Sequence, residues 1–134
     1  MTWAADYIGI PFVPGGRDRT GCDCWGLVHL ISREVFSRVL PDLGNLYVLN
    51  PEELAGSAAK AFSSFRPLVD GERVSTPEAG DIVVMKYRGF PCHVGIVVDQ
   101  DHVLHVERGA DSILSRLSSP QISARVEGIY RCRN

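Results

Sequence analysis

The feature that most constrains the fold is a change of pattern past the middle of the chain. Before Pro77 the apolar residues recur at helical spacing, whereas later they alternate or form short runs rich in β-branched residues. Strands are expected at 81–86, 93–98, 103–107, 112–117 and 126–132. Helices followed by strands are typical of an α+β domain, here with N-terminal helices packed on an antiparallel sheet.

Three helices are expected in the first half. A short one covers roughly residues 2–8, and one beginning with Pro51 ends near Phe62. Between them lies a long helix, which Asp23 is suited to cap and Pro41 to stop. Its expected apolar face consists of Leu27, Val28, Ile31, Val35 and Val39.

Size and composition set the broad class. A chain of 134 residues with 45% hydrophobic content is expected to form one domain, residues 1–134. The net charge of -2 gives no broad basic field, so no nucleic-acid partner is expected. The longest apolar runs have strand length, far below the roughly 20 residues of a membrane helix, so no membrane insertion is expected. The N-terminus lacks the pattern of a signal peptide, and the four cysteines are not expected to form a disulfide framework.

One motif joins a glycine-rich loop to the long helix. The segment Gly21-Cys22-Asp23-Cys24-Trp25-Gly26-Leu27 places Cys24 in the first helical turn. Unpaired N–H groups and the positive end of the helix dipole stabilise a thiolate there, and a thiolate is the nucleophilic form. Gly26 is expected to leave room beside the sulfur for a substrate backbone.

Two histidines are expected beside each other on the strands. In segments 93–98 and 102–107 the large apolar residues occupy even positions, so they share one face. The two-residue period then puts His93 and His105 together on the other face of a hairpin that turns at 99–101. A thiol, an imidazole and a second polar group form an activated nucleophile, with base and orienting residue. His29 and His102 are expected in surface or packing roles.

Two other interpretations of these residues are open. Cys24 could be a buried apolar cysteine, and Cys22, Cys92 and Cys132 are expected to be packing residues. The cysteines at 22, 24 and 92 with His93 and His105 could also bind zinc, but a Cys-x-Cys pair is tighter than usual zinc spacing. Neighbours 92 and 93 would also point to opposite sides of a strand. We therefore expect neither a metal nor another cofactor.

Taken together, these motifs resemble the NlpC/P60 family of cell-wall peptidases. The shared features are Asp23-Cys24-Trp25-Gly26-Leu27 at a helix start, Gly80-Asp81, and His93-Val94-Gly95-Ile96 on a strand, followed by a third polar residue, His105. The resemblance implies a papain-like fold and hydrolysis of amide bonds in peptidoglycan stem peptides, commonly between D-glutamate and a diamino acid. It implies Cys24 as nucleophile, His93 as base and His105 as the residue that orients His93.

The resemblance also implies binding residues and two departures. The Cys24 N–H would donate to the oxyanion. Asp23 would contact the free amino end of the substrate, as in some members, and Trp25, where a serine is common, would lie beside the substrate. Phe12 stands where many members have tyrosine, so any hydroxyl contribution to the oxyanion site is absent.

Three segments further resemble the branch of the family found in phage tails and gene transfer agents. They are Ile10-Pro11-Phe12, Gly16-Arg17-Asp18 and Asp23-Cys24-Trp25-Gly26-Leu27-Val28. This branch implies a protein made in the bacterial cytoplasm, carried in a virion tail tip with other tail proteins, and acting at the cell wall. A structural tail-tip or tail-assembly protein that retains the fold is the main alternative. An acyltransferase is a weaker one, because lipid-modifying relatives generally place histidine before cysteine in sequence.

Overall fold

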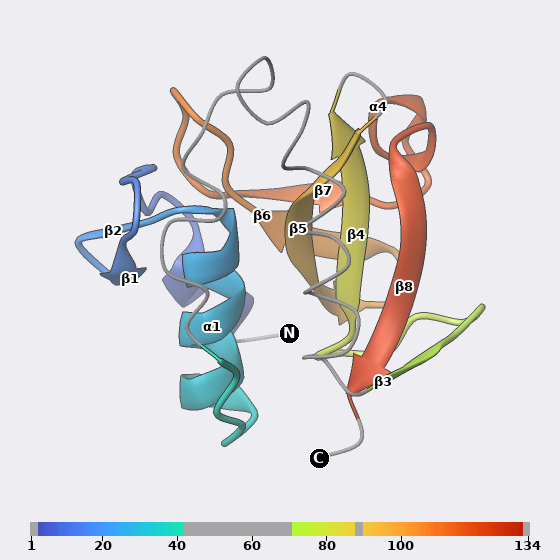
Figure 1. The fold of residues 1–134 in the computed structure, drawn as a ribbon, viewed down its shortest axis with the longest axis horizontal. Coiled ribbons are helices and arrows are strands. Elements are labelled where there is room, and N and C mark those ends of the chain that lie inside the picture. The colour runs from blue at the N-terminus through green and yellow to red at the C-terminus, as the bar shows by residue number, and fades with distance from the viewer. Residues whose placement is uncertain (1–2, 42–70, 88–89, 133–134) are drawn as a thin grey trace.

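The computed structural model describes residues 3–41, 71–87 and 90–132. Helix α1 lies along one side of an antiparallel sheet, which confirms the expected α+β class (Figure 1). The helix expected from Pro51 lies outside the described residues. In chain order the elements are η1 (Ala4–Tyr7), β1 (Arg17–Asp18), β2 (Gly21–Cys22), α1 (Cys24–Val35), β3 (Gly71–Arg73), β4 (Ile82–Tyr87), β5 (Phe90–Asp99), β6 (His102–His105), β7 (Ile113–Arg116), α4 (Pro120–Ser123) and β8 (Val126–Cys132).

The main sheet has the strand order β3-β8-β4-β5-β6-β7, with every neighbouring pair antiparallel. All five strands expected from the sequence are present, and the hairpin β5–β6 turns at the expected place. Strand β3 and helix α4 were not predicted. Each is only three or four residues long, which is too short to show a period.

Helix α1 begins where the sequence predicts and ends earlier. The Asp23 side chain accepts a hydrogen bond from the Gly26 N–H, so its capping role is confirmed. The expectation that the helix continues to Pro41 was wrong, because it ends at Val35 and Val39 is 81% exposed. Ser37 adopts a positive φ of 51°, which turns the chain. The turn lets Arg38 donate to Ser32 Oγ and to the Gly80 carbonyl, and these buried hydrogen bonds replace a further helical turn.

The expected N-terminal helix is a single 3-10 turn, η1. Tyr7 anchors it to α1, because the phenol is buried and its hydroxyl donates to Glu34 Oε1 at 2.8 Å. The segment after η1 then runs beside residues 110–112, where the Gly9 N–H donates to the Ser112 carbonyl. No helix among the described residues is long and apolar enough to cross a membrane.

The core is divided between the two faces of the sheet. On one face α1 packs against β5, and the cluster includes all the even-numbered apolar positions predicted to share a face, which are Val94, Ile96, Val98, Leu104 and Val106. On the other face Val97 and Val103 pack with Ile122 of α4. The two-residue period therefore separates a helix-facing apolar layer from a smaller second cluster.

Candidate active site

Cys24 is the first residue of α1 and is 5% exposed. The colours of Figure 1 show that α1 and β5 begin at the same end of the molecule. The first N–H groups of α1 have no partner within the helix and carry the positive end of its dipole. This setting favours an anionic sulfur at Cys24. The start of α1 lies at the same end of the molecule as the start of β5.

Both oxygens of the Asp23 carboxylate, next to Cys24, have hydrogen-bond partners. It is 0% exposed and accepts hydrogen bonds from the N–H groups of Gly26 at 2.7 Å and Gly15 at 3.1 Å. Arg17 Nη1 lies 2.8 Å from Asp23 Oδ1, so the carboxylate charge is paired. Asp23 thus joins the preceding loop to the start of α1, and a contact with a substrate amine would need Arg17 and Gly15 to move away.

Gly26 lies where the preceding loop packs on the start of α1. The expectation that Gly26 leaves room for a substrate was therefore wrong. A Cβ at this position would lie 1.9 Å from the Gly16 carbonyl oxygen and 3.0 Å from Asp23 Oδ1. The space beside Gly26 is therefore filled by the loop backbone. The glycine allows residues 15–17 to pack on the first turn of α1.

Cys22 lies two residues before Cys24 in a different environment. Its side chain is 0% exposed and its Sγ donates to the Asp18 carbonyl at 3.1 Å. Burial, with the nearby carboxylates of Asp23 and Asp18, raises the pKa of the Cys22 thiol to about 12. Cys22 is a protonated packing residue, as expected, and the side chain of Cys92 lies outside the described set.

The structure places His93 of β5 and His105 of β6 side by side. Their facing nitrogens, His93 Nε2 and His105 Nδ1, are 3.0 Å apart. The other nitrogen of His105, Nε2, lies 3.0 Å from Ser115 Oγ on β7. The two histidines are only 6% and 3% exposed, so the parity of the strands produced a buried hydrogen-bonded pair.

Burial keeps this pair neutral. It lowers the pKa of His93 well below the ordinary value of 6.5, and the neighbouring His105 and the Arg125 guanidinium lower it further. Burial also lowers the pKa of His105, where the Glu107 carboxylate acts in the opposite direction and Arg125 in the same one. A neutral imidazole has one N–H and one lone pair, so His93 can accept a proton at neutral pH.

Sequence reasoning missed a charged pair beside the histidines. Glu107 Oε1 lies 3.5 Å from His93 Nε2 and 2.6 Å from Arg125 Nη1. Arg125 is itself held to the end of β4, since its Nε donates to the Lys86 carbonyl. The position of Glu107 could have been found from parity, because it follows His105 by two residues. The approach of Arg125, which precedes β8, could not.

His93, His105 and Glu107 present ligand atoms within 4.8 Å of one another, the arrangement that a metal ion would need. Their contacts favour a hydrogen-bonded cluster instead. The 3.0 Å contact of the two imidazoles occupies the lone pair that a metal would take, and Arg125 Nη1 already neutralises Glu107 Oε1. The thiol of Cys22 is protonated and bonded to a carbonyl, so it is not suited to the zinc set considered from the sequence.

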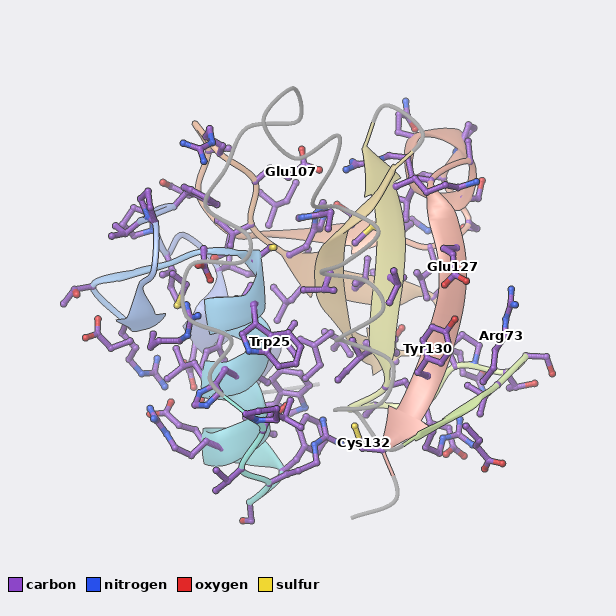
Figure 2. The ribbon with its side chains drawn as sticks, viewed as in Figure 1. Trp25, Arg73, Glu107, Glu127, Tyr130 and Cys132 are labelled. Atoms are coloured by element: carbon purple, nitrogen blue, oxygen red, sulfur yellow. The ribbon has the colours of Figure 1, made fainter. Side chains whose placement is uncertain are left out.

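Trp25 is completely buried, and its indole Nε1 donates to the Pro41 carbonyl at 2.9 Å. Figure 2 shows it between α1 and the sheet, where it belongs to the main core cluster. Packing accounts for this position, and a substrate contact of Trp25 remains a prediction. His102 is the first residue of β6, where its Nδ1 lies 2.8 Å from Asp99 Oδ1, a local contact at the hairpin turn.

Two curated proteins are similar in sequence to this chain. Protein P54 of Enterococcus faecium is 29% identical over 110 residues, covering 82% of the chain and 18% of that protein. The murein DD-endopeptidase MepS/murein LD-carboxypeptidase of Escherichia coli K12 is 25% identical over 120 residues, covering 90% of the chain and 54% of that protein. The chain thus spans at most about half of these curated relatives.

The solved structures share the fold. The NlpC/p60 domain of the peptidoglycan hydrolase SagA superposes with a TM-score of 0.62 at 24% identity, over 97% of the chain and 93% of that domain. The model of the NlpC/P60 family matches residues 9–131, which include α1 and, except for Cys132 at the end of β8, all of the main sheet. The chain therefore belongs to the NlpC/P60 family.

Proposed function

We propose that the protein is a cysteine peptidase that hydrolyses amide bonds in peptidoglycan stem peptides, with Cys24 as nucleophile, His93 as base and His105 as the residue that orients His93. The observation that carries the proposal is the buried His93–His105 pair, with His93 Nε2 bonded to His105 Nδ1. Because Nε2 is occupied, Nδ1 of His93 is the nitrogen available to a thiol. The start of α1 at Cys24 supplies that thiol at the same end of the molecule as the start of β5 (Figure 1).

The chemistry has two stages. His93 Nδ1 takes the thiol proton of Cys24, the sulfur attacks the amide carbon, and the Cys24 N–H donates to the oxygen that becomes negative. The tetrahedral intermediate collapses to a thioester as His93 gives its proton to the leaving amine. Water, deprotonated by His93, then attacks the thioester carbon and releases the carboxylic acid, while the proton returns to the Cys24 sulfur.

The decisive experiment incubates the protein with purified peptidoglycan and measures new amine ends. We expect release by the wild type and at least a roughly 10³-fold lower rate for Cys24→Ala, because the nucleophile is gone. Cys22→Ala is the matched control, since its thiol is protonated and bonded to the Asp18 carbonyl. Equal rates for wild type and Cys24→Ala would refute the proposal, and transfer products in place of hydrolysis would indicate the acyltransferase alternative.

Contact between Cys24 and His93 can be tested without a substrate. If His93 accepts the Cys24 proton, alkylation of Cys24 by iodoacetamide at neutral pH is fast and slows in His93→Ala, because thiolate is the reactive form. An unchanged alkylation rate would show that His93 does not activate the thiol. Mass spectrometry assigns the label to Cys24 or to another cysteine.

For the bond that is cut, we propose the link between D-glutamate and the diamino acid. The family resemblance supports this bond, whereas the name of MepS gives a DD-endopeptidase activity for that relative. A stem tripeptide separates the two, because it contains the first bond and lacks a DD cross-link. Cleavage of cross-linked dimers with an intact tripeptide would favour the second bond.

Asp23 is proposed as a second contact, to the amino end of the stem peptide. It requires release of Asp23 from Gly15 and Arg17, which hold it in the structure. If Asp23 binds the amine, N-acetylation of the substrate raises KM, and Arg17→Ala, which frees the carboxylate, lowers KM for the free amine. A KM insensitive to N-acetylation would leave Asp23 as a helix cap alone.

We further propose that the protein acts from a phage-type tail tip at the cell wall, with tail proteins as partners. The support is the resemblance of Ile10-Pro11-Phe12, Gly16-Arg17-Asp18 and Asp23-Cys24-Trp25-Gly26-Leu27-Val28 to that branch of the family. Mass spectrometry of purified particles tests the location. Particles that form with Cys24→Ala but not after deletion of the gene would indicate an assembly role alongside hydrolysis.

A further inference from the structure

Glu107 and Arg125 form an ion pair directly beside the two histidines and have no role in the mechanism above. Glu107 Oε1 lies 2.6 Å from Arg125 Nη1 and 3.5 Å from His93 Nε2. The ion pair is partly buried, since the Glu107 side chain is 38% exposed and that of Arg125 25%. Figure 2 places Glu107 at the end of the molecule where α1 begins.

The histidine pair can carry its hydrogens in two ways. In the first, His93 Nε2–H donates to His105 Nδ1, and His105 Nε2–H donates to Ser115 Oγ. In the second, the Ser115 hydroxyl donates to His105 Nε2, and His105 Nδ1–H donates to His93 Nε2. Both satisfy the same two contacts, because a serine hydroxyl donates and accepts equally well.

Only the first arrangement leaves a base. With hydrogen on Nε2, the Nδ1 of His93 has a lone pair that can take a thiol proton. With hydrogen on Nδ1, the lone pair of His93 points at His105 and cannot reach a substrate or a thiol. The hydrogen bonds between the histidines and Ser115 do not choose between the two, so another group must do so.

Glu107 favours the first arrangement, with hydrogen on His93 Nε2. At 3.5 Å its carboxylate oxygen attracts a hydrogen on His93 Nε2 and repels a lone pair there. Arg125 neutralises the overall charge of Glu107, so the Glu107–Arg125 ion pair hardly favours the protonated form of His93. The negative end of this ion pair, the Glu107 carboxylate, still faces the His93 ring. The Arg125 Nε–H bond to the Lys86 carbonyl holds that orientation.

We propose that Glu107, held by Arg125, is a positioning residue that fixes the hydrogen of neutral His93 on Nε2 and leaves Nδ1 as the base. The inference rests on the proposed function of His93 for its importance to catalysis. Its structural content, the location of one hydrogen, does not depend on activity.

Nitrogen-15 NMR of the histidine rings in the full chain tests the proposal directly. In the wild type at neutral pH we expect the His93 Nε2 signal to be protonated and the Nδ1 signal unprotonated. Glu107→Gln should shift the signals toward a mixture of the two forms. Glu72→Gln, at an exposed position on β3, removes the same charge far from the pair and should leave both signals unchanged.

Kinetics provide the second measurement. Glu107→Gln is expected to lower kcat about tenfold with KM changed less than about twofold, because fewer molecules hold the base form while binding is untouched. Hydrogen on His93 Nδ1 in the wild type would overturn the inference even if the variant does not fold. Unchanged tautomers and kcat in folded Glu107→Gln would also overturn it. A wild type with the expected tautomer but no hydrolysis would refute the proposed function and leave this inference standing.

Discussion

The two ends of the β5–β6 hairpin each hold a histidine contact of similar length in opposite environments. At the turn His102 Nδ1 lies 2.8 Å from Asp99 Oδ1, and both side chains are about one third exposed, at 32% and 34%. At the other end His93 and His105 lie 3.0 Å apart and are almost fully buried. A short contact therefore does not by itself indicate a functional histidine. The buried pair is shielded from solvent, so its neighbours decide where its protons lie.

The largest expected effect is a difference in peptidoglycan hydrolysis between variants at the two ends of the β5–β6 hairpin. His93→Ala should lower peptidoglycan hydrolysis by at least about 10³-fold, because the general base is lost. His102→Ala, at the turn, should keep the wild-type rate within about twofold, because the contact with Asp99 is local and exposed. Comparable losses in both variants would show that the hairpin ends do not differ in role.

Gly95 tests how closely the strands must approach beside the buried pair. A Cβ there would lie 2.7 Å from Val103 Cγ2, 2.9 Å from the Leu104 carbonyl oxygen and 3.1 Å from His105 Cβ. Gly95→Ala should therefore lower the free energy of unfolding by about 2–3 kcal/mol, measured by urea denaturation. A loss below about 0.5 kcal/mol would mean that the strands separate easily.

Removing one residue of the histidine contact at each end of the β5–β6 hairpin should lower the free energy of unfolding by different amounts. His105→Ala leaves His93 Nε2 without its partner in a buried place, so we expect a loss of about 1–2 kcal/mol in the free energy of unfolding. Asp99→Ala removes an exposed partner of His102 and should cost less than about 1 kcal/mol. Thermal and urea unfolding of both variants at neutral pH make the comparison, and a reversed order would contradict it.

The smallest expected effect is a shift in pH dependence. Burial, His105 and Arg125 lower the pKa of His93, so neutral base persists and the acid limb of kcat/KM lies below pH 6.5. Arg125→Gln removes one of the groups that lower the pKa of His93. It also leaves Glu107 without its cation, and the Glu107 carboxylate raises the pKa of His105. The limb should then move to higher pH. A limb that stays in place or moves lower would show that Arg125 does not act on the pair.

Local sequence patterns determined most of this molecule. The period of two on the strands was sufficient to pair His93 with His105, because successive side chains alternate between faces wherever a strand forms. The cap at Asp23 was readable for a similar reason, since it depends only on residues within one helical turn. These contacts are short in sequence or follow from a simple repeat.

Other features required the tertiary structure. Helix α1 ends early because Arg38 reaches the carbonyl of Gly80, a residue 42 positions away, which no local period contains. Gly26 is needed for the packing of the Gly16 backbone, although the sequence suggested open space for a substrate. Arg125 meets Glu107 only because β8 lies beside β4 in the sheet, and that strand order is set by the whole fold. The sequence alone determined which histidines meet, whereas the folded chain decided which charges surround them, because charges act through space between distant segments.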